Sequence, residues 1–395
     1  MKQLNYDFRD LYRSPRIGLS FQRIWTNGLG LFAAFLVYFF FSYLSLWISG
    51  YAMGPAWYLF GLLPCAFAVP ATWLGMAVYI AGLFFSMAVI LLTNTAMARL
   101  TYMVLRNEVF YTWTQAFRFA FRKWISVGGA FLTFLFLIGS LAIAAIVIGF
   151  IGRIPVIGEL LTVLFTIPYI FAAFLLIFII IAFFAGIFFI PAILATMDED
   201  AIGGVFQSFS ITFNQPWRLL LYSLQAVILE IVSMLVFAFF LKLSYLVFVT
   251  LFSWGMGEKM AEISVVAERA VHNSLPALYD WLHILFGKAA DWVYLSKIPP
   301  IPAEPSIFVY LAGIIFAFFL LILGGAALAY GEAVGNSGMT ISYLIIYRRH
   351  NRDELLKRED EELIEATGEG TEADLPPVEN SETINPIQQE PPKKE

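Results

Sequence analysis

The sequence predicts an all-α, polytopic membrane protein, and three observations support that class. Hydrophobic residues make up 60% of the 395 residues and charged residues only 13%. The mean hydropathy of +0.78 is far above that of soluble globular domains. Six apolar stretches each reach the roughly 20 residues that cross the hydrocarbon core as a helix. These predicted spans are 28–48, 73–96, 126–150, 169–195, 219–241 and 307–331.

The charges outside the spans predict the orientation. Arginine and lysine cluster before the first span, between the second and third, and after the sixth, whereas the connection 49–72 carries no charge. Basic connections stay on the cytoplasmic side. We therefore expect both termini in the cytoplasm and the chain in a bacterial cytoplasmic (inner) membrane. The 10 tryptophans lie at predicted helix ends or in connections, as in an interfacial aromatic belt.

Residues 1–27 are predicted to form a cytoplasmic amphipathic segment ahead of the transmembrane domain 28–349. A motif of a small residue, Phe, three residues and an aromatic residue precedes spans one, three and five. Its phenylalanines are Phe21, Phe117 and Phe209, which are 96 and 92 residues apart. Such spacing indicates three repeats of one unit, a cytoplasmic elbow helix followed by a two-span hairpin. An aromatic stripe opposite basic residues predicts that the elbows lie in the headgroup plane.

Three further segments complete the map. The apolar run 160–197 is too long for one crossing, and Pro168 is predicted to break it. Broken helices flank binding sites in transporters, but a chain that re-enters the bundle is the favoured interpretation here. The segment 243–306 is predicted to be an outer-face insertion with an amphipathic helix over 275–292. The acidic tail 350–395 is expected to be largely disordered.

Glu230 is the candidate functional residue, because it is the one formally charged residue inside a predicted span. An unpaired charge there costs several kcal/mol, so Glu230 must face protein or water, or carry a proton. It shares a small, polar helical face with Ser223, Ala226 and Ser233. Two interpretations compete: Glu230 binds a cation or proton in a transport path, or it hydrogen-bonds a neighbouring helix such as the one carrying Asn94. The structural interpretation is favoured.

The end of the sixth span carries a ladder of small residues. Ala327, Gly331 and Gly335 recur every four residues, a spacing that lets another helix approach closely. The partner is either an internal helix or a second subunit, and an internal helix is favoured.

No motif indicates catalysis or a cofactor. The sequence contains 3 histidines, which are scattered, and Cys65 is its one cysteine. It lacks a paired-His motif, a P-loop, a nucleophile elbow and a dinucleotide fingerprint. A metal site and nucleic-acid binding are likewise not predicted.

Four short motifs carry a family resemblance. They are the Ile154-Pro155-Val156-Ile157-Gly158 turn, the Asp200 to Trp217 segment with Phe209, Phe213 and Pro216, the Arg218 that follows, and Ser342-Tyr343-Leu344-Ile345-Ile346-Tyr347-Arg348-Arg349. In these the chain resembles uncharacterised bacterial multi-pass membrane proteins, loosely related to the membrane domain of some glycerophosphoryl diester phosphodiesterases. The resemblance covers the six-helix body but not the tail. It implies a helix bundle and no established activity.

The expected role is a non-catalytic membrane scaffold or accessory subunit. Its partners would be membrane lipids and a protein bound at the cytoplasmic face or at the acidic tail. The alternative is a transporter of a small solute or lipid that uses Glu230. A lipid-modifying membrane enzyme is the third interpretation.

Overall fold

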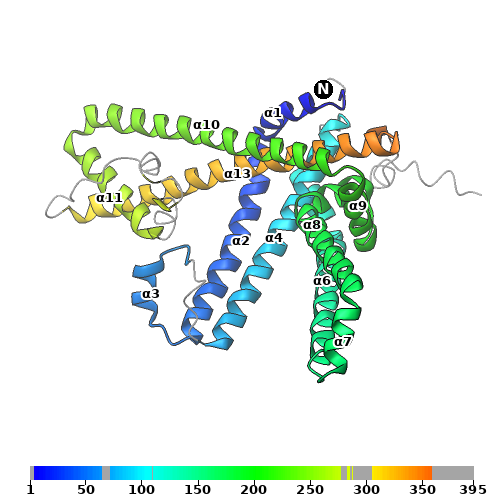
Figure 1. The fold of residues 1–395 in the computed structure, drawn as a ribbon. Coiled ribbons are helices and arrows are strands. Elements are labelled where there is room, and N and C mark those ends of the chain that lie inside the picture. Colours follow the sequence, from blue (N-terminus) through cyan, green and yellow to red (C-terminus); the bar gives the residue numbers. More distant parts are fainter. Residues whose placement is uncertain are drawn as a thin grey trace, which may run out of the picture. The chain divides into compact units, whose positions relative to one another are not determined.

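The computed structural model describes residues 4–64, 72–108, 110–276, 283–284, 287 and 305–357. By contacts the chain divides into two units, Met1–Leu355 and Leu356–Glu395. Every regular element in the described residues is a helix (Figure 1), so the all-α prediction is confirmed. The helices are η1 Phe8–Arg13, α1 Ser14–Gly18, α2 Phe21–Ile48, α3 Met53–Phe60, α4 Trp73–Leu105, α5 Trp113–Arg122, α6 Trp124–Ile151, α7 Ile157–Leu164, α8 Thr166–Met197, α9 Ala201–Asn214, α10 Pro216–Met256, α11 Glu258–Ser274, α13 Ile307–Asn351 and η3 Leu355–Lys357.

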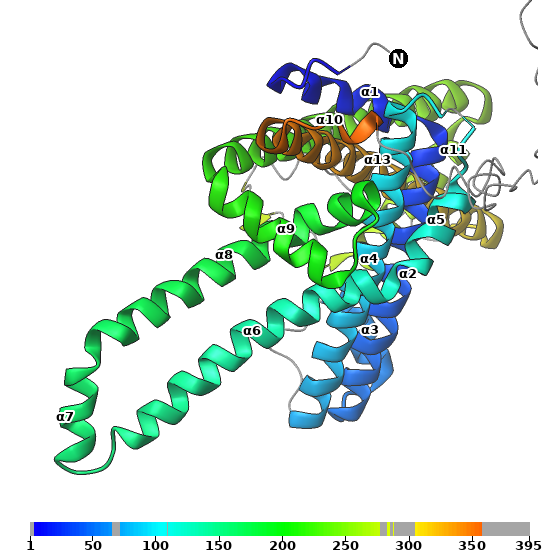
Figure 2. The same cartoon turned by 90° about the vertical axis from the view of Figure 1, so that its right-hand side faces the viewer.

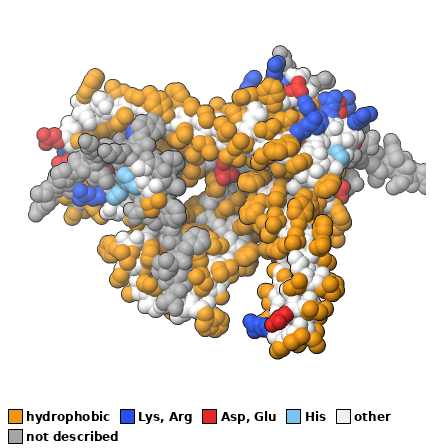
Figure 3. All heavy atoms as spheres, in the orientation of Figure 1, with side chains coloured by type: hydrophobic (Ala, Val, Ile, Leu, Met, Phe, Trp, Pro, Cys, Tyr) orange, Lys and Arg blue, Asp and Glu red, His pale blue; other side chains and the backbone are white. Residues whose placement is uncertain are grey.

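Six of the described helices are long and apolar enough to cross a membrane, namely α2, α4, α6, α8, α10 and α13. Each contains one of the predicted spans. Hydrophobic side chains cover most of the surface seen in Figure 3, as expected for a chain that lipid surrounds. Basic side chains gather in that view around the N-terminal segment.

Several helices extend beyond the predicted spans. α2 begins at Phe21, inside the segment predicted to precede the membrane domain, and α13 continues 20 residues past position 331 to Asn351. α10 runs to Met256, so the helix of the fifth predicted span continues through residues 243–256, the first part of the predicted insertion. The physical reason is that helical hydrogen bonds continue into polar sequence, whereas apolarity marks only the stretch in contact with lipid. The amphipathic helix predicted over 275–292 lies largely outside the described residues.

The long helices form three consecutive pairs, each joined by a short connection or insertion. α2 packs on α4, α6 on α8, and α10 on α13. Figures 1 and 2 show α6 and α8 as a hairpin whose tip is α7, and α10 beside α13. α11, which the sequence analysis did not predict, packs against both α10 and α13. Its contact includes a buried hydrogen bond from the Tyr245 hydroxyl to Glu268.

The predicted break of the fourth span is present, but its position is slightly different. α7 ends at Leu164, Phe165 has φ −96° and ψ 18°, and α8 begins at Thr166. Pro168 lies in the first turn of α8, where its missing N–H has no helical acceptor in any case. The proline therefore marks the start of a helix and not its interruption.

Short helices precede α6 and α10. α5 starts at a capping box between Thr112 and Gln115. α9 starts at Asp200, whose carboxylate accepts the Gly203 N–H at 2.7 Å. The neighbouring Asp198 forms a 2.6 Å ion pair with Lys123, so two acids of the 198–200 run have helix-terminal roles. The Phe21 copy of the repeated motif differs from the other two, because it lies in the first turn of α2 itself.

The most continuously buried segments belong to three helices. They are 95–103 of α4, 189–196 of α8 and 337–347 of α13. Arg99 joins this core to α5: its guanidinium donates to the Ala195 carbonyl at 3.0 Å and lies 4.4 Å from the centre of the Phe119 ring. With only 2% of its surface exposed, Arg99 is held by these contacts and not by water.

Candidate functional site

The packing of α10 against α13 places the candidate residues. Ala226 of α10 lies against Gly338, Glu230 against Gly335, and Met234 against Gly331. Rising numbers on α10 meet falling numbers on α13, so the helices are antiparallel. Glycines at these contacts let the two backbones approach closely, as in other membrane helix pairs. The small-residue ladder therefore faces an internal helix at Gly331 and Gly335, while Ala327 is buried one turn earlier.

Glu230 has a second carboxylate as its electrostatic neighbour. A Cβ at position 335 would overlap the carboxylate of Glu230, so this side chain lies over the bare backbone of Gly335. Glu332, one turn before, is the charged group that acts on Glu230. Glu230 is the one charged residue inside the predicted spans, and Glu332 lies outside them. The predicted sixth span ended at position 331, one residue short of Glu332.

Neither carboxylate has a recorded polar partner. In the described part of the chain, no hydrogen bond or ion pair is formed by Glu230 or Glu332, and both side chains are half-buried. No basic side chain among those residues acts on Glu230. Two acids at this level of facing apolar helices are costly to keep ionised together, so a bound proton or cation would stabilise them.

Three asparagine side chains, one on α13 and one each on α4 and α2, make contacts with α13 close to Glu332. Asn336, one turn after Glu332, donates to the Oδ1 of Asn94 on α4 at 3.0 Å. Asn94 thus pairs with α13 and not with Glu230, because α4 contacts α13 at this level. Asn27 of α2 donates to the Ala329 carbonyl at 3.4 Å, one turn before Glu332. The Oδ1 of Asn27 is buried and accepts no hydrogen bond from the described residues.

The two serines predicted to share the face of Glu230 differ in their roles. Ser233 is buried, and its side chain interacts with that of Tyr330 on α13. Ser223 donates to the Leu219 carbonyl of its own helix at 2.7 Å. Ser233 therefore belongs to the contact between the helices, whereas Ser223 satisfies its hydroxyl locally. Pro168 is exposed on the first turn of α8 and is not part of this group.

The ligand types limit what the site can hold. Among the residues the structure describes, no group of three or more His, Cys, Asp and Glu side chains could bind a metal ion. Two carboxylates with amide oxygens nearby supply oxygen ligands only. Oxygen ligands bind a proton or a hard cation. Sequence reasoning missed Glu332, Asn336 and Asn27. Glu332 was detectable as an acid at the edge of an apolar run, whereas its proximity to Glu230 had no sequence signal.

Searches against protein-family models, curated proteins and solved structures gave no match to this chain. The resemblance to the phosphodiesterase-associated membrane domain stays a prediction.

Proposed function

We propose that this chain is a membrane transport protein in which Glu230 and Glu332 bind a proton or a small cation. The observation that carries the proposal is geometric: the Glu230 carboxylate of α10 lies against Gly335 of α13, one turn from Glu332, on two facing helices of membrane length. A buried charge pair of like sign costs free energy that a purely structural role does not repay. Binding of a cation or proton supplies the missing counter-charge.

The proposal includes a topology. Both termini lie in the cytoplasm of a bacterial inner membrane, and α5 and α9 lie in its headgroup region as elbows. The aromatic residues Trp113 and Phe121 of α5, and Phe110 and Trp124 on either side of it, are exposed, which suits insertion at the interface. The series of a short helix and a packed helix pair occurs three times, as α1–α2–α4, α5–α6–α8 and α9–α10–α13. This recurrence supports three repeats of one unit.

The test is flux through proteoliposomes that contain the purified protein. Proton flux is followed with an internal pH-sensitive dye, under gradients of Na⁺, K⁺, NH₄⁺, Mg²⁺ and Ca²⁺ tested singly. We expect one gradient to drive flux, and Glu230→Gln and Glu332→Gln each to abolish it. Glu159→Gln, at an exposed acid of α7, is the matched control and should retain wild-type flux. Absence of flux under every gradient, or wild-type flux in both site variants, contradicts the proposal.

A second candidate function is the non-catalytic scaffold or accessory subunit, and one observation favours it. The tail starts from a fixed base: Arg349 pairs with Asp7 at 2.7 Å, Arg348 pairs with Glu354 at 2.5 Å, and the Tyr102 hydroxyl donates to the Leu355 carbonyl at 2.8 Å. Burial, together with the nearby Glu354, raises the pKa of Tyr6 in this cluster to about 12. A fixed base presents an acidic tail to a partner at a defined place on the cytoplasmic face.

The scaffold is tested by purification from native membranes in mild detergent. A chain ending at Lys357 keeps the anchored Leu355 and removes only the tail. A near-stoichiometric protein that copurifies with the full chain and is lost from the shortened one supports the scaffold. A protein retained equally by both chains would place the interface elsewhere and contradict the role of the tail.

A further inference from the structure

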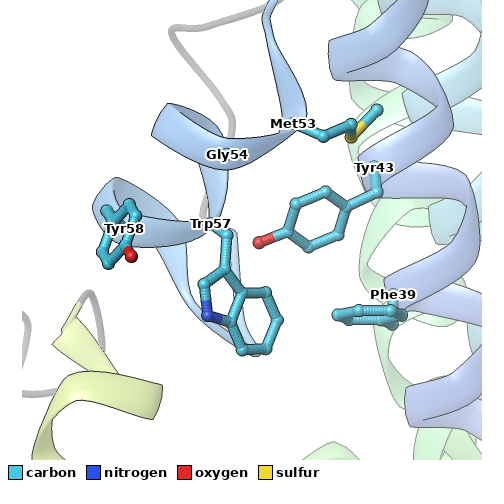
Figure 4. Close-up of a pocket in the computed structure, with 6 residues that line it drawn as sticks. All are labelled: Phe39, Tyr43, Met53, Gly54, Trp57 and Tyr58. Atoms are coloured by element: carbon cyan, nitrogen blue, oxygen red, sulfur yellow. The ribbon is translucent and has the colours of Figure 1, made fainter.

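A recess lined by aromatic side chains lies between α2 and α3, well away in sequence from the carboxylates. Its lining comes from Phe39 and Tyr43 of α2 and from Met53, Gly54, Trp57 and Tyr58 of α3. In Figure 4, Trp57 points from α3 toward Tyr43 and Phe39, whereas Tyr58 points away. The recess has a volume of about 580 Å³ and is open toward its surroundings.

Three rings define the recess. The Phe39 and Tyr43 ring centres are 4.8 Å apart, and the Trp57 ring lies 6.4 Å from Phe39 and 6.2 Å from Tyr43. Interplanar angles of 50°, 81° and 35° between these pairs mean that the rings are not stacked in parallel. These separations and angles are those of aromatic rings packed against one another. The ring faces that remain exposed are the electron-rich surfaces available to an organic cation.

The recess is held in shape by hydrogen bonds outside it. The Tyr43 hydroxyl donates to the Gly61 carbonyl at 2.6 Å, and the Gly61 N–H donates to the Trp57 carbonyl at 2.9 Å. Gly61 has φ +58°, a conformation that favours glycine. At Gly54 a Cβ would meet nothing within 4 Å, so the lining there is bare and open. A recess fixed in this way loses little conformational entropy when it binds a ligand.

Charge and position select the ligand. No lining residue is charged, and the whole connection 49–72 carries no charge, so an anion finds no counter-charge and a cation meets no repulsion. Tyr43 lies five residues before the end of α2, about 8 Å along the axis. In the proposed topology the end of α2 lies at the outer membrane surface, which places Tyr43 near the boundary between headgroups and acyl chains, where Tyr and Trp are enriched.

We propose that the recess formed by Phe39, Tyr43 and Trp57 binds the methylated ammonium headgroup of a membrane lipid. A lipid fits better than a free cation because the recess is open and shallow. An open cation–π site is weak, and the high local concentration of lipid in the bilayer compensates for that weakness. This site is independent of the carboxylate pair, and neither proposal requires the other.

Native mass spectrometry of the purified full chain tests the site. The probes are phosphatidylcholine, the same lipid with a neutral 3,3-dimethylbutyl group in place of choline, and phosphatidylglycerol, all with identical chains. We expect phosphatidylcholine to bind most tightly, and Trp57→Leu to weaken that binding by roughly five- to thirtyfold. Trp57→Phe, which keeps an aromatic ring, should restore part of the affinity. Trp73→Leu, at an exposed tryptophan at the start of α4, is the matched control.

Three results would overturn the proposal. Equal binding of phosphatidylcholine and its neutral analogue would show that the recess binds acyl chains and does not recognise the charged headgroup. Unchanged phosphatidylcholine binding in Trp57→Leu would place the lipid elsewhere. Binding of tetramethylammonium, added as a fourth probe, with no preference among the three lipids would assign the recess to a soluble cation.

Discussion

At the scale of single residues, Gly335 decides what Glu230 can do. Its lack of a side chain creates the space that the Glu230 carboxylate occupies beside α13. Glutamate has a flexible side chain, so a methyl group at position 335 would displace the carboxylate more readily than it would separate the helices. The position of the charge is thus more sensitive to this glycine than the fold is.

Gly335→Ala should therefore alter cation response with little loss of stability. We expect the melting temperature in detergent to fall by an amount equivalent to about 1 kcal/mol or less, while any cation-dependent stabilisation of the wild type is lost. Gly324→Ala, on the same helix where a Cβ would meet nothing within 4 Å, is the control. If Gly335→Ala and Gly324→Ala respond to cations alike, the carboxylate does not depend on this contact.

At the scale of elements, close approach between paired helices depends on individual glycines. On α2, a Cβ at Gly30 would overlap the side chain of Thr93 on α4. Thr93 is β-branched and buried, so it cannot rotate away as the Glu230 carboxylate can. The α2–α4 pair is therefore less tolerant of a methyl group than the α10–α13 pair.

Gly30→Ala should destabilise the protein by about 1–3 kcal/mol, measured as a fall in the melting temperature. Gly28→Ala, two residues earlier, would bring its Cβ only to ordinary contact with Ala329 at 3.8 Å and should change stability little. Equal melting temperatures for the two variants would mean that α2 and α4 pack differently from the structure.

Arg99 links the elements α4, α5 and α8. Replacing it with methionine keeps an apolar stem but removes the hydrogen bond to the Ala195 carbonyl and the contact with Phe119. We expect Arg99→Met to cost about 2–4 kcal/mol and to speed proteolysis in the connection before α5. Arg118→Met, at an exposed arginine of α5, should do neither. Wild-type proteolysis in Arg99→Met would show that α5 is held by other contacts.

At the scale of the whole molecule, the proposed topology assigns each helix end to one side of the membrane. Because Cys65 is the single cysteine of the sequence, a Cys65→Ala background allows one cysteine to be introduced at a time. We expect a membrane-impermeant maleimide to label Tyr58→Cys and Arg153→Cys from outside right-side-out vesicles. Arg16→Cys and Asn351→Cys should be labelled only after permeabilisation.

All four positions are exposed in the structure, and full labelling after permeabilisation controls for reactivity. Labelling of Arg16→Cys and Asn351→Cys in intact vesicles would show that the orientation is the opposite of the proposed one. Labelling of only one of these two would exclude six crossings.

The six membrane-length helices of the described residues could be predicted because lipid leaves no alternative for a long apolar segment. Their ends were less predictable, because α10 and α13 continue into polar sequence under their own hydrogen bonds. α11 was missed because its composition is mixed, and only its packing on α10 and α13 explains it. Glu230 was identified from its position in an apolar run, whereas Glu332 was missed by a single residue.

The sequence by itself determined the helical class, the number of membrane-length helices and the presence of a carboxylate among apolar residues, since each follows from local composition. Only the tertiary structure decided that Glu230 faces Gly335 and interacts with Glu332, that Asn94 pairs with Asn336, and that Trp57 joins Phe39 and Tyr43. These are contacts between separate helices. When helices are apolar on every side, their composition does not specify which faces meet. Close packing between small and polar residues specifies those faces.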